Sequence, residues 1–107
     1  MRSETERCLW DDFDKACKEA DAEYSLATAR AARQRDAVLN VPWEGKSPHV
    51  DRAAEARYAR LEEAARAARD EKLKRAEEVL MKGLDDCEEE QRQSHPLVSA
   101  FSVVLLL

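Results

Sequence analysis

The chain has 107 residues, of which 38% are charged and 6% are aromatic, and its formal net charge is −5. Because so few large apolar residues cannot build a layered globular interior, the composition favours long helices that share one narrow apolar interface. The negative net charge argues against an obligate nucleic-acid-binding protein, since phosphate groups are contacted mainly by clustered Lys and Arg.

Neither end of the chain reads as a targeting or membrane segment. The N-terminal residues MRSETERCLW lack a basic patch followed by an apolar run, so we expect no secretory signal. The longest apolar stretch, residues 97–107, is far shorter than the roughly 20 residues that a bilayer requires, and we expect no transmembrane segment. The cysteines are odd in number, and Cys8 and Cys17 point to opposite sides of one helix. Free thiols and a cytoplasmic protein fit this pattern best.

The first helix is predicted over about residues 3–39. Ser3 and Glu6 have the spacing of a capping box, and the helix should end before Val41 because that residue precedes Pro42. Apolar residues then recur in alternating steps of three and four, as in a coiled coil. The residues expected to face a partner helix are Trp10, Phe13, Cys17, Ala20, Tyr24, Ala27, Ala31, Gln34 and Val38.

Residues 40–47 are predicted to form a bend, and the second helix follows over residues 48–93. Ser47 can cap this helix, Pro48 suits its first position, and acid-before-base pairs such as Glu62–Arg66 recur along it. Gly83 is expected to interrupt it locally. Its expected interface residues are Ala54, Tyr58, Leu61, Ala65, Leu73, Ala76, Leu80, Leu84 and Cys87, with a step of eleven residues between Ala65 and Ala76.

Together these elements predict an all-α fold: a long antiparallel helical hairpin, similar to a coiled coil, over residues 1–93, with a short apolar C-terminal element over residues 94–107. Folding at the bend should bring Phe13 near Ala76 and Leu80, and Tyr24 near Leu61. Since the middle of the interface is mostly alanine, it buries little area. We therefore expect another chain or the C-terminal element to cover the hairpin.

The C-terminal element is a candidate assembly surface. Its composition suits a strand as well as a short buried helix, and both alternatives remain open. An exposed apolar segment of this kind promotes aggregation, so it should be buried against the hairpin or another chain. The candidate residues are Leu97, Val98, Phe101, Val103, Val104 and Leu105.

No pattern in the sequence indicates catalysis or a cofactor. The acidic run over residues 85–90 is typical of a solvated helix end, and His49 and His95 have no ligand-forming residues at metal-site spacing. No glycine-rich phosphate loop is present, and Cys17 fits a small interface residue. We expect no enzyme activity, no metal and no cofactor.

The charges, however, are unevenly distributed. Residues 1–23 hold eight acidic and four basic residues and residues 77–90 hold seven and one, whereas residues 30–75 carry an excess of positive charge. A hairpin would bring the acidic segments to its open end and the basic ones toward its bend. This arrangement predicts a binding surface for an acidic protein or a phosphate backbone, as an alternative to a solubility pattern. Its candidate residues are Arg30, Arg33, Arg35, Arg52, Arg57, Arg60 and Trp43.

One short motif, Trp43-Glu44-Gly45, lies between the two predicted helices. A chain of about a hundred residues with this motif in its turn resembles the WXG100 family, and the resemblance covers residues 3–90. It implies a small secreted helical hairpin that forms dimers. That family also carries an export signal of Tyr and an acidic residue after its second helix, whereas here Tyr58 and Glu62 fall inside the helix.

Three functions follow from these patterns. The first is a non-enzymatic interaction or assembly subunit, acting as an adaptor or as a homodimer. The second is a secreted hairpin similar to the WXG100 family, and the third is a nucleic-acid-associated accessory protein that uses the basic bend.

Overall fold

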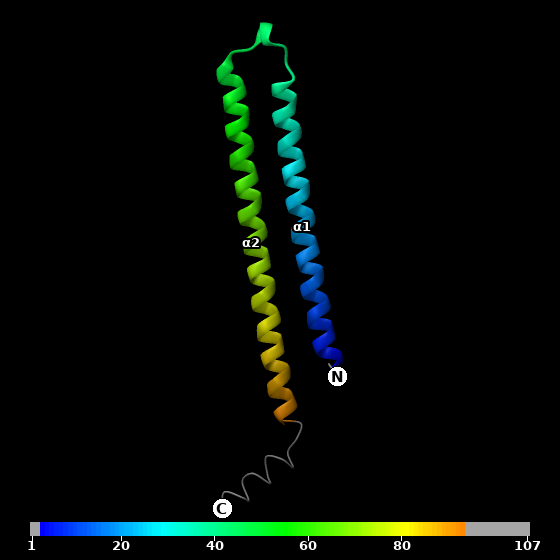
Figure 1. The fold of residues 1–107 in the computed structure, drawn as a ribbon. Helices are drawn as coiled ribbons and strands as arrows, with labels where there is room; N and C mark the ends of the chain where they lie inside the picture. The colour runs from blue at the N-terminus through cyan, green and yellow to red at the C-terminus, as the bar shows by residue number, and fades with distance from the viewer. Residues whose placement is uncertain (1–2, 94–107) are drawn as a thin grey trace, which may run out of the picture.

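The computed structural model describes residues 3–93, which form two long antiparallel helices joined by a short turn (Figure 1). Helix α1 spans Glu4–Leu39, a short 3-10 helix η1 spans Trp43–Gly45, and α2 spans Pro48–Gln93. No strand occurs between residues 3 and 93. The expected all-α helical hairpin is confirmed. The candidate assembly residues Leu97, Val98, Phe101, Val103, Val104 and Leu105 lie outside the described residues.

Both helices begin at the capping residues that the sequence indicates. The Ser3 hydroxyl accepts a hydrogen bond of 3.1 Å from the Glu6 backbone N–H. The Ser47 hydroxyl accepts one of 3.2 Å from the His49 N–H, directly before the first helical residue, Pro48. These side chains satisfy N–H groups that have no partner inside the helix, and so they fix where each helix starts.

The bend is held by a lysine that the sequence analysis did not single out. The Lys46 ammonium donates to the backbone carbonyls of Val38 and Leu39, at 3.0 and 3.1 Å, and forms an ion pair with Asp51 at 2.7 Å. Its side chain is only 4% exposed. Because the last carbonyls of a helix lack partners and carry partial negative charge, Lys46 both caps α1 and ties it to the first turn of α2.

The interhelical interface differs from the predicted one. Ala27, Gln34 and Leu61 are exposed, and Trp10 is 37% exposed while packing edge-on against Phe13. The half-buried residues at those levels are instead their neighbours Thr28, Arg35 and Glu62. A straight α-helix drifts by about 20° per heptad relative to a seven-residue repeat, so an apolar heptad pattern turns gradually out of the interface.

Polar side chains with long apolar stems occupy interface positions that the apolar pattern did not predict. The Arg35 guanidinium lies 4.1 Å from the centre of the Tyr58 ring. Half-buried Arg69 lies between Ala65 and Leu73 of the predicted pattern, with its guanidinium 4.5 Å from the Tyr24 ring centre. Such side chains cover apolar surface with their stems and place their guanidinium groups over aromatic rings, which explains how charged residues occupy this interface.

Gly83 does not interrupt α2, which runs unbroken to Gln93, so that expectation was wrong. The glycine instead makes room for Leu9 of α1, because a Cβ atom added there would lie 2.6 Å from a Leu9 methyl carbon. A glycine inside a helix costs about 1 kcal/mol relative to alanine, and here it allows the helices to pack closely near the open end of the hairpin.

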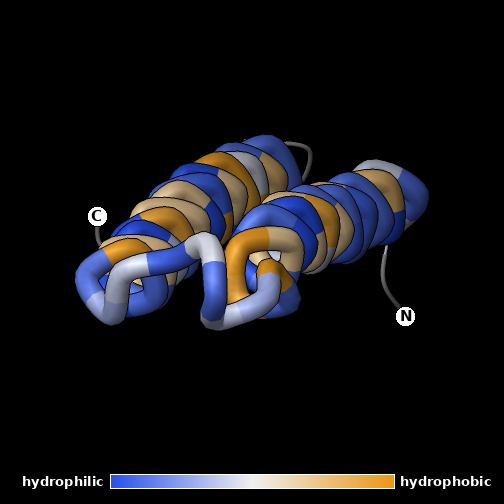
Figure 2. The backbone as a smooth tube through the Cα atoms, turned by 90° about the horizontal axis from the view of Figure 1, so that it is seen from above, coloured by the Kyte–Doolittle hydropathy of each residue, from blue (hydrophilic) through white to orange (hydrophobic). Residues whose placement is uncertain are grey.

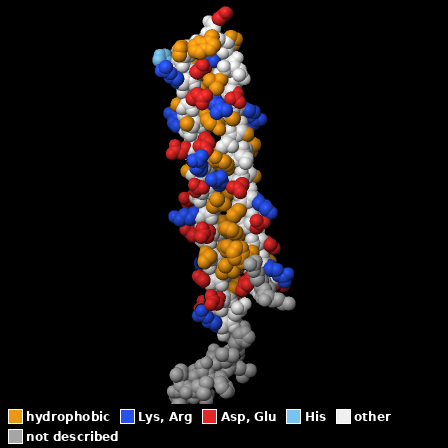
Figure 3. All heavy atoms as spheres, in the orientation of Figure 1, with side chains coloured by type: hydrophobic (Ala, Val, Ile, Leu, Met, Phe, Trp, Pro, Cys, Tyr) orange, Lys and Arg blue, Asp and Glu red, His pale blue; other side chains and the backbone are white. Residues whose placement is uncertain are grey.

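The interface buries little of the chain. Among the described residues the buried core consists of Ala20, Ala31, Leu80 and Cys87, and no side chain is less than 2% exposed. Hydrophobic and hydrophilic segments alternate along both helices (Figure 2), and hydrophobic side chains reach the surface along the boundary between them (Figure 3). Two helices alone therefore leave much of their apolar surface in contact with water.

Candidate interaction surface

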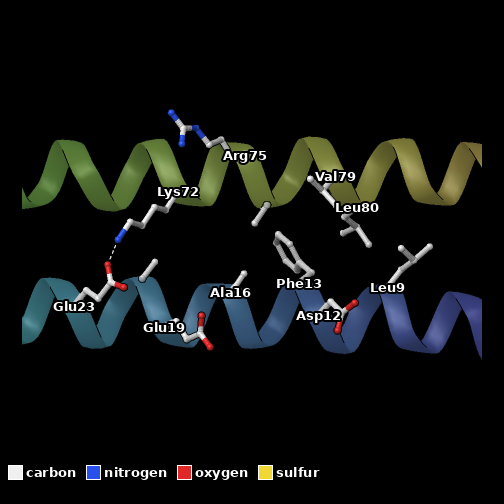
Figure 4. Close-up of a pocket in the computed structure, with 12 residues that line it drawn as sticks. Leu9, Asp12, Phe13, Ala16, Glu19, Glu23, Lys72, Arg75, Val79 and Leu80 are labelled. Atoms are coloured by element: carbon white, nitrogen blue, oxygen red, sulfur yellow. Dashed lines mark ion pairs between the residues drawn. The ribbon is translucent and has the colours of Figure 1, made fainter.

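An apolar groove lies between the helices near the open end, and we call it the open-end groove. Its floor is formed by Leu9, Phe13, Ala16 and Ala20 from α1 and by Ala76, Val79 and Leu80 from α2. The cavity has a volume of about 410 Å³. In Figure 4 the Phe13 ring extends into the space between the two helices, toward α2. The groove has the volume and apolar lining that a buried side chain of a partner would require.

Charged residues surround this apolar floor. Lys72 forms an ion pair with Glu23 across the groove (Figure 4), and Arg75 pairs with Glu71 at 3.3 Å on its own helix. Asp12 and Glu19 also line the groove, but they form no ion pair within residues 3–93. The rim of the open-end groove therefore has two acidic side chains whose charge is not matched by the hairpin itself.

A second groove, the bend-side groove, lies between the same helices closer to the turn, with a volume of about 310 Å³. It contains two arginines, and no carboxylate lines it. Its lining residues are Ala31, Gln34, Arg35, Ala37, Val38, Ala54, Arg57, Tyr58 and Leu61. The charge around this groove is thus opposite in sign to the unmatched charge around the other.

The two grooves open on the same side of the hairpin. Leu61 lines one and Val79 the other, and they are 18 residues apart, as are Ala16 and Gln34. At 3.6 residues per turn, 18 residues make five full turns, so both members of each pair point in the same direction. Leu61 and Val79 are 39% and 66% exposed. We call this side, with both grooves, the groove face.

The predicted arginine surface is spread around both helices. Arg30, Arg33, Arg52, Arg57, Arg60 and Trp43 are exposed, and none of these arginines forms an ion pair within the described part of the chain. Arg35 is half-buried on Tyr58 and pairs with Asp36 at 3.2 Å. Arg52 and Arg57 are separated by about 140° of helical rotation. The structure brings Arg35 and Arg57 together at the bend-side groove and leaves Arg52 on another side.

One polar cluster links the middle of the two helices. The Tyr24 hydroxyl donates a 2.7 Å hydrogen bond to Glu62, which also accepts one of 2.5 Å from Arg66. The Tyr24 hydrogen bond is the main cause that lowers the pKa of Glu62, with Arg66 contributing and desolvation opposing the shift. Tyr24 meets Glu62 rather than Leu61, its expected neighbour. The cluster links the two helices and helps to hold them in register.

The remaining reactive groups are isolated. Burial raises the pKa of the Cys87 thiol, with nearby Glu90, Glu6 and Asp86 adding to the shift, so this thiol is poorly reactive. Cys8 is exposed, Cys17 is half-buried, and His49 is exposed in the first turn of α2. Within residues 3–93 no three His, Cys, Asp or Glu side chains are grouped to hold a metal ion.

Comparisons with protein-family models, with curated proteins and with solved structures found no match to this chain. The Trp43-Glu44-Gly45 motif does lie in the turn of a helical hairpin, but the resemblance to the WXG100 family gains no support from these comparisons. Neither described helix has a stretch apolar and long enough to cross a membrane.

The apolar heptad pattern does not mark the groove face. The signal was present in the 18-residue spacing of Ala16 with Gln34 and of Leu61 with Val79, which marks one direction on a straight helix.

Proposed function

We propose that this protein is a non-enzymatic helical interaction and assembly subunit of the cytoplasm, which binds another protein chain through the groove face. The observation that carries the proposal is the small buried core of Ala20, Ala31, Leu80 and Cys87, beside two apolar grooves that stay open to solvent. A helix gains most of its stability in a protein from packing an apolar face. A further layer of helices would therefore stabilise a hairpin in which so little apolar surface is packed.

The chemistry of the groove face supports a protein partner. An apolar floor with a charged rim is the usual anatomy of a protein interface, where the apolar centre supplies affinity and the rim selects the partner. Several polar groups near the grooves are already paired with one another, as in Lys72 with Glu23 and Arg35 with Asp36. Covering the apolar floor would therefore contribute more binding free energy than contacting these paired groups.

Sedimentation equilibrium of the full chain at micromolar concentration tests this function, with Val79→Glu and Met81→Glu as a matched pair. Both residues are exposed and lie on α2, at 66% and 53%, but two residues turn the helix by about 200°. We expect the parent to associate, Val79→Glu to weaken association at least tenfold, and Met81→Glu to leave it unchanged.

Two results would overturn the proposal. One is a parent chain that stays monomeric at every concentration and unfolds in one cooperative transition. The other is association that Met81→Glu disrupts and Val79→Glu does not, because the interaction surface would then lie away from the grooves.

The exposed arginines favour a second candidate, a nucleic-acid-associated protein. Arg33, Arg52 and Arg60 have no ion pair within the described residues and remain accessible to phosphate groups. Phosphate contacts of this kind make binding strongly dependent on salt, which gives this candidate a direct test.

A further inference from the structure

We infer that the occupant of the groove face is a second copy of this chain in the antiparallel orientation, so that the open-end groove of each copy packs on the bend-side groove of the other. The inference rests on the proposed function and names the partner at the same surface. The product is a four-helix bundle with a twofold axis, in which α1 of one copy lies against α1 of the other.

The charges at the two ends of the hairpin select this orientation. Residues 1–23 carry four more acids than bases and residues 77–90 carry six more, whereas residues 30–75 carry four more bases than acids. A parallel dimer would bring both acidic ends together. Three of these four extra bases lie in residues 64–75, which pack beside the acidic half of α1, as Lys72 does with Glu23, and residues 30–63 around the bend hold seven bases and six acids. An antiparallel dimer places each acidic end beside this nearly neutral bend half of the other copy, which avoids that repulsion.

Single charged residues along α1 also favour the antiparallel orientation. Asp12 and Arg30 are 18 residues apart on α1, so they point in the same direction five full turns from each other. Reversing one copy so that Ala16 lies opposite Gln34 of the other copy places Glu19 of each chain near Arg30 of the other, and Asp12 lies farther toward the bend of that copy. None of these three side chains forms an ion pair within residues 3–93 of its own chain.

The centre of the face permits close approach. Midway between the two grooves lie Ala27 on α1 and Ala68 on α2, and both are exposed. Ala68 lies seven residues after Leu61 and eleven before Val79, so it shares their direction within about a quarter turn. Small residues at the twofold axis let the helices of the two copies approach, and the larger side chains Phe13, Leu61 and Val79 then fill the facing grooves.

Cross-linking between two single-cysteine proteins tests the orientation. One protein keeps exposed Cys8 at the open end and carries Cys17→Ala and Cys87→Ala. The other carries Ala37→Cys in the bend half, together with Cys8→Ser, Cys17→Ala and Cys87→Ala. With a short bismaleimide we expect cross-links when the two proteins are mixed and almost none within either protein alone.

The possible results separate the inference from the proposed function. Cross-linking within each protein alone shows a parallel dimer, which overturns the inference and leaves an assembly subunit in place. A monomeric parent overturns both. If residues 97–107 of the same chain covered the groove face, the full chain would be monomeric and Val79→Glu would lower its melting temperature at every concentration equally.

Charge reversal provides a second measurement that needs no cysteine replacement. We expect Glu19→Arg and Arg30→Glu each to weaken dimerisation roughly 2–10-fold, and the two substitutions combined in one chain to restore much of the loss. Lys15→Glu serves as a control on the same helix, because exposed Lys15 does not line either groove. Additive loss in the combined variant would contradict the antiparallel contact.

Discussion

At the residue scale, Lys46 stabilises the bend between the two helices. Replacing it by Met keeps the length of the side chain but leaves Val38 O and Leu39 O without their hydrogen-bond donor and the Asp51 carboxylate without its ion-pair partner. Because unsatisfied polar groups that are shielded from water cost about 1–3 kcal/mol, we expect Lys46→Met to lower the free energy of unfolding by that amount. Chemical denaturation measured by circular dichroism checks this, with exposed Lys15→Met as the control. Equal stability of the two variants would contradict the role of Lys46.

Lys46 also shows what a sequence pattern leaves out. The bend itself could be predicted from Pro42, which disfavours a helical conformation at the preceding residue, together with Gly45 close by. The use of Lys46 could not, because it depends on the three-dimensional path that brings residue 46 back over the last carbonyls of α1. The same holds for Arg69, whose place on the Tyr24 ring follows from the register of the two helices.

At the element scale, the contact of Tyr24 with Glu62 makes the packing of the helices sensitive to acid. The pKa of Glu62 lies below its ordinary value of 4.5, so folding favours the ionised carboxylate. The corresponding stability is fully present above about pH 4.5 and is lost as the pH falls through the lowered pKa. We expect Tyr24→Phe to lower the melting temperature at pH 7, with the difference from the parent shrinking below about pH 4.5.

Tyr58→Phe is the control for that prediction, because the Tyr58 hydroxyl makes no hydrogen bond in the described part of the chain while its ring still faces Arg35. Thermal melts of parent and variants from pH 7 to pH 3 supply the measurement. A difference between the parent and Tyr24→Phe that stays constant across this range would show that the hydrogen bond does not act through ionised Glu62.

The helices themselves were predictable because their starting points depend on local chemistry. Ser3 and Ser47 cap the helices through bonds to residues two or three positions away, and such short-range rules can be applied to the sequence alone. The interface was less predictable. Ala27 and Leu61 fit an apolar repeat, but whether a helix supercoils enough to keep them facing its partner depends on how both helices pack.

At the scale of the whole molecule, the hairpin is a long rod with unlike ends. The 36 residues of α1 span about 54 Å, so the acidic open end and the exposed arginines near the bend lie several Debye lengths apart at physiological salt. Such ends act as separate charges in an encounter with another chain. The sequence predicts this separation of charge. It does not predict the groove face, because each groove is lined by residues of both helices.

The arginines on the outer sides of the hairpin decide between an assembly subunit and a nucleic-acid-associated protein. Arg33, Arg52 and Arg60 are exposed and do not line the grooves, so replacing all three by Gln should change neither the melting temperature nor the dimerisation constant by a measurable amount. We expect the parent, with its net charge of −5, to show no binding to random-sequence DNA at physiological salt. Fluorescence anisotropy over a salt titration measures this directly. If the parent bound DNA with a steep salt dependence and the triple variant had a shallower slope, the arginines would be phosphate contacts and the nucleic-acid function would replace the assembly function.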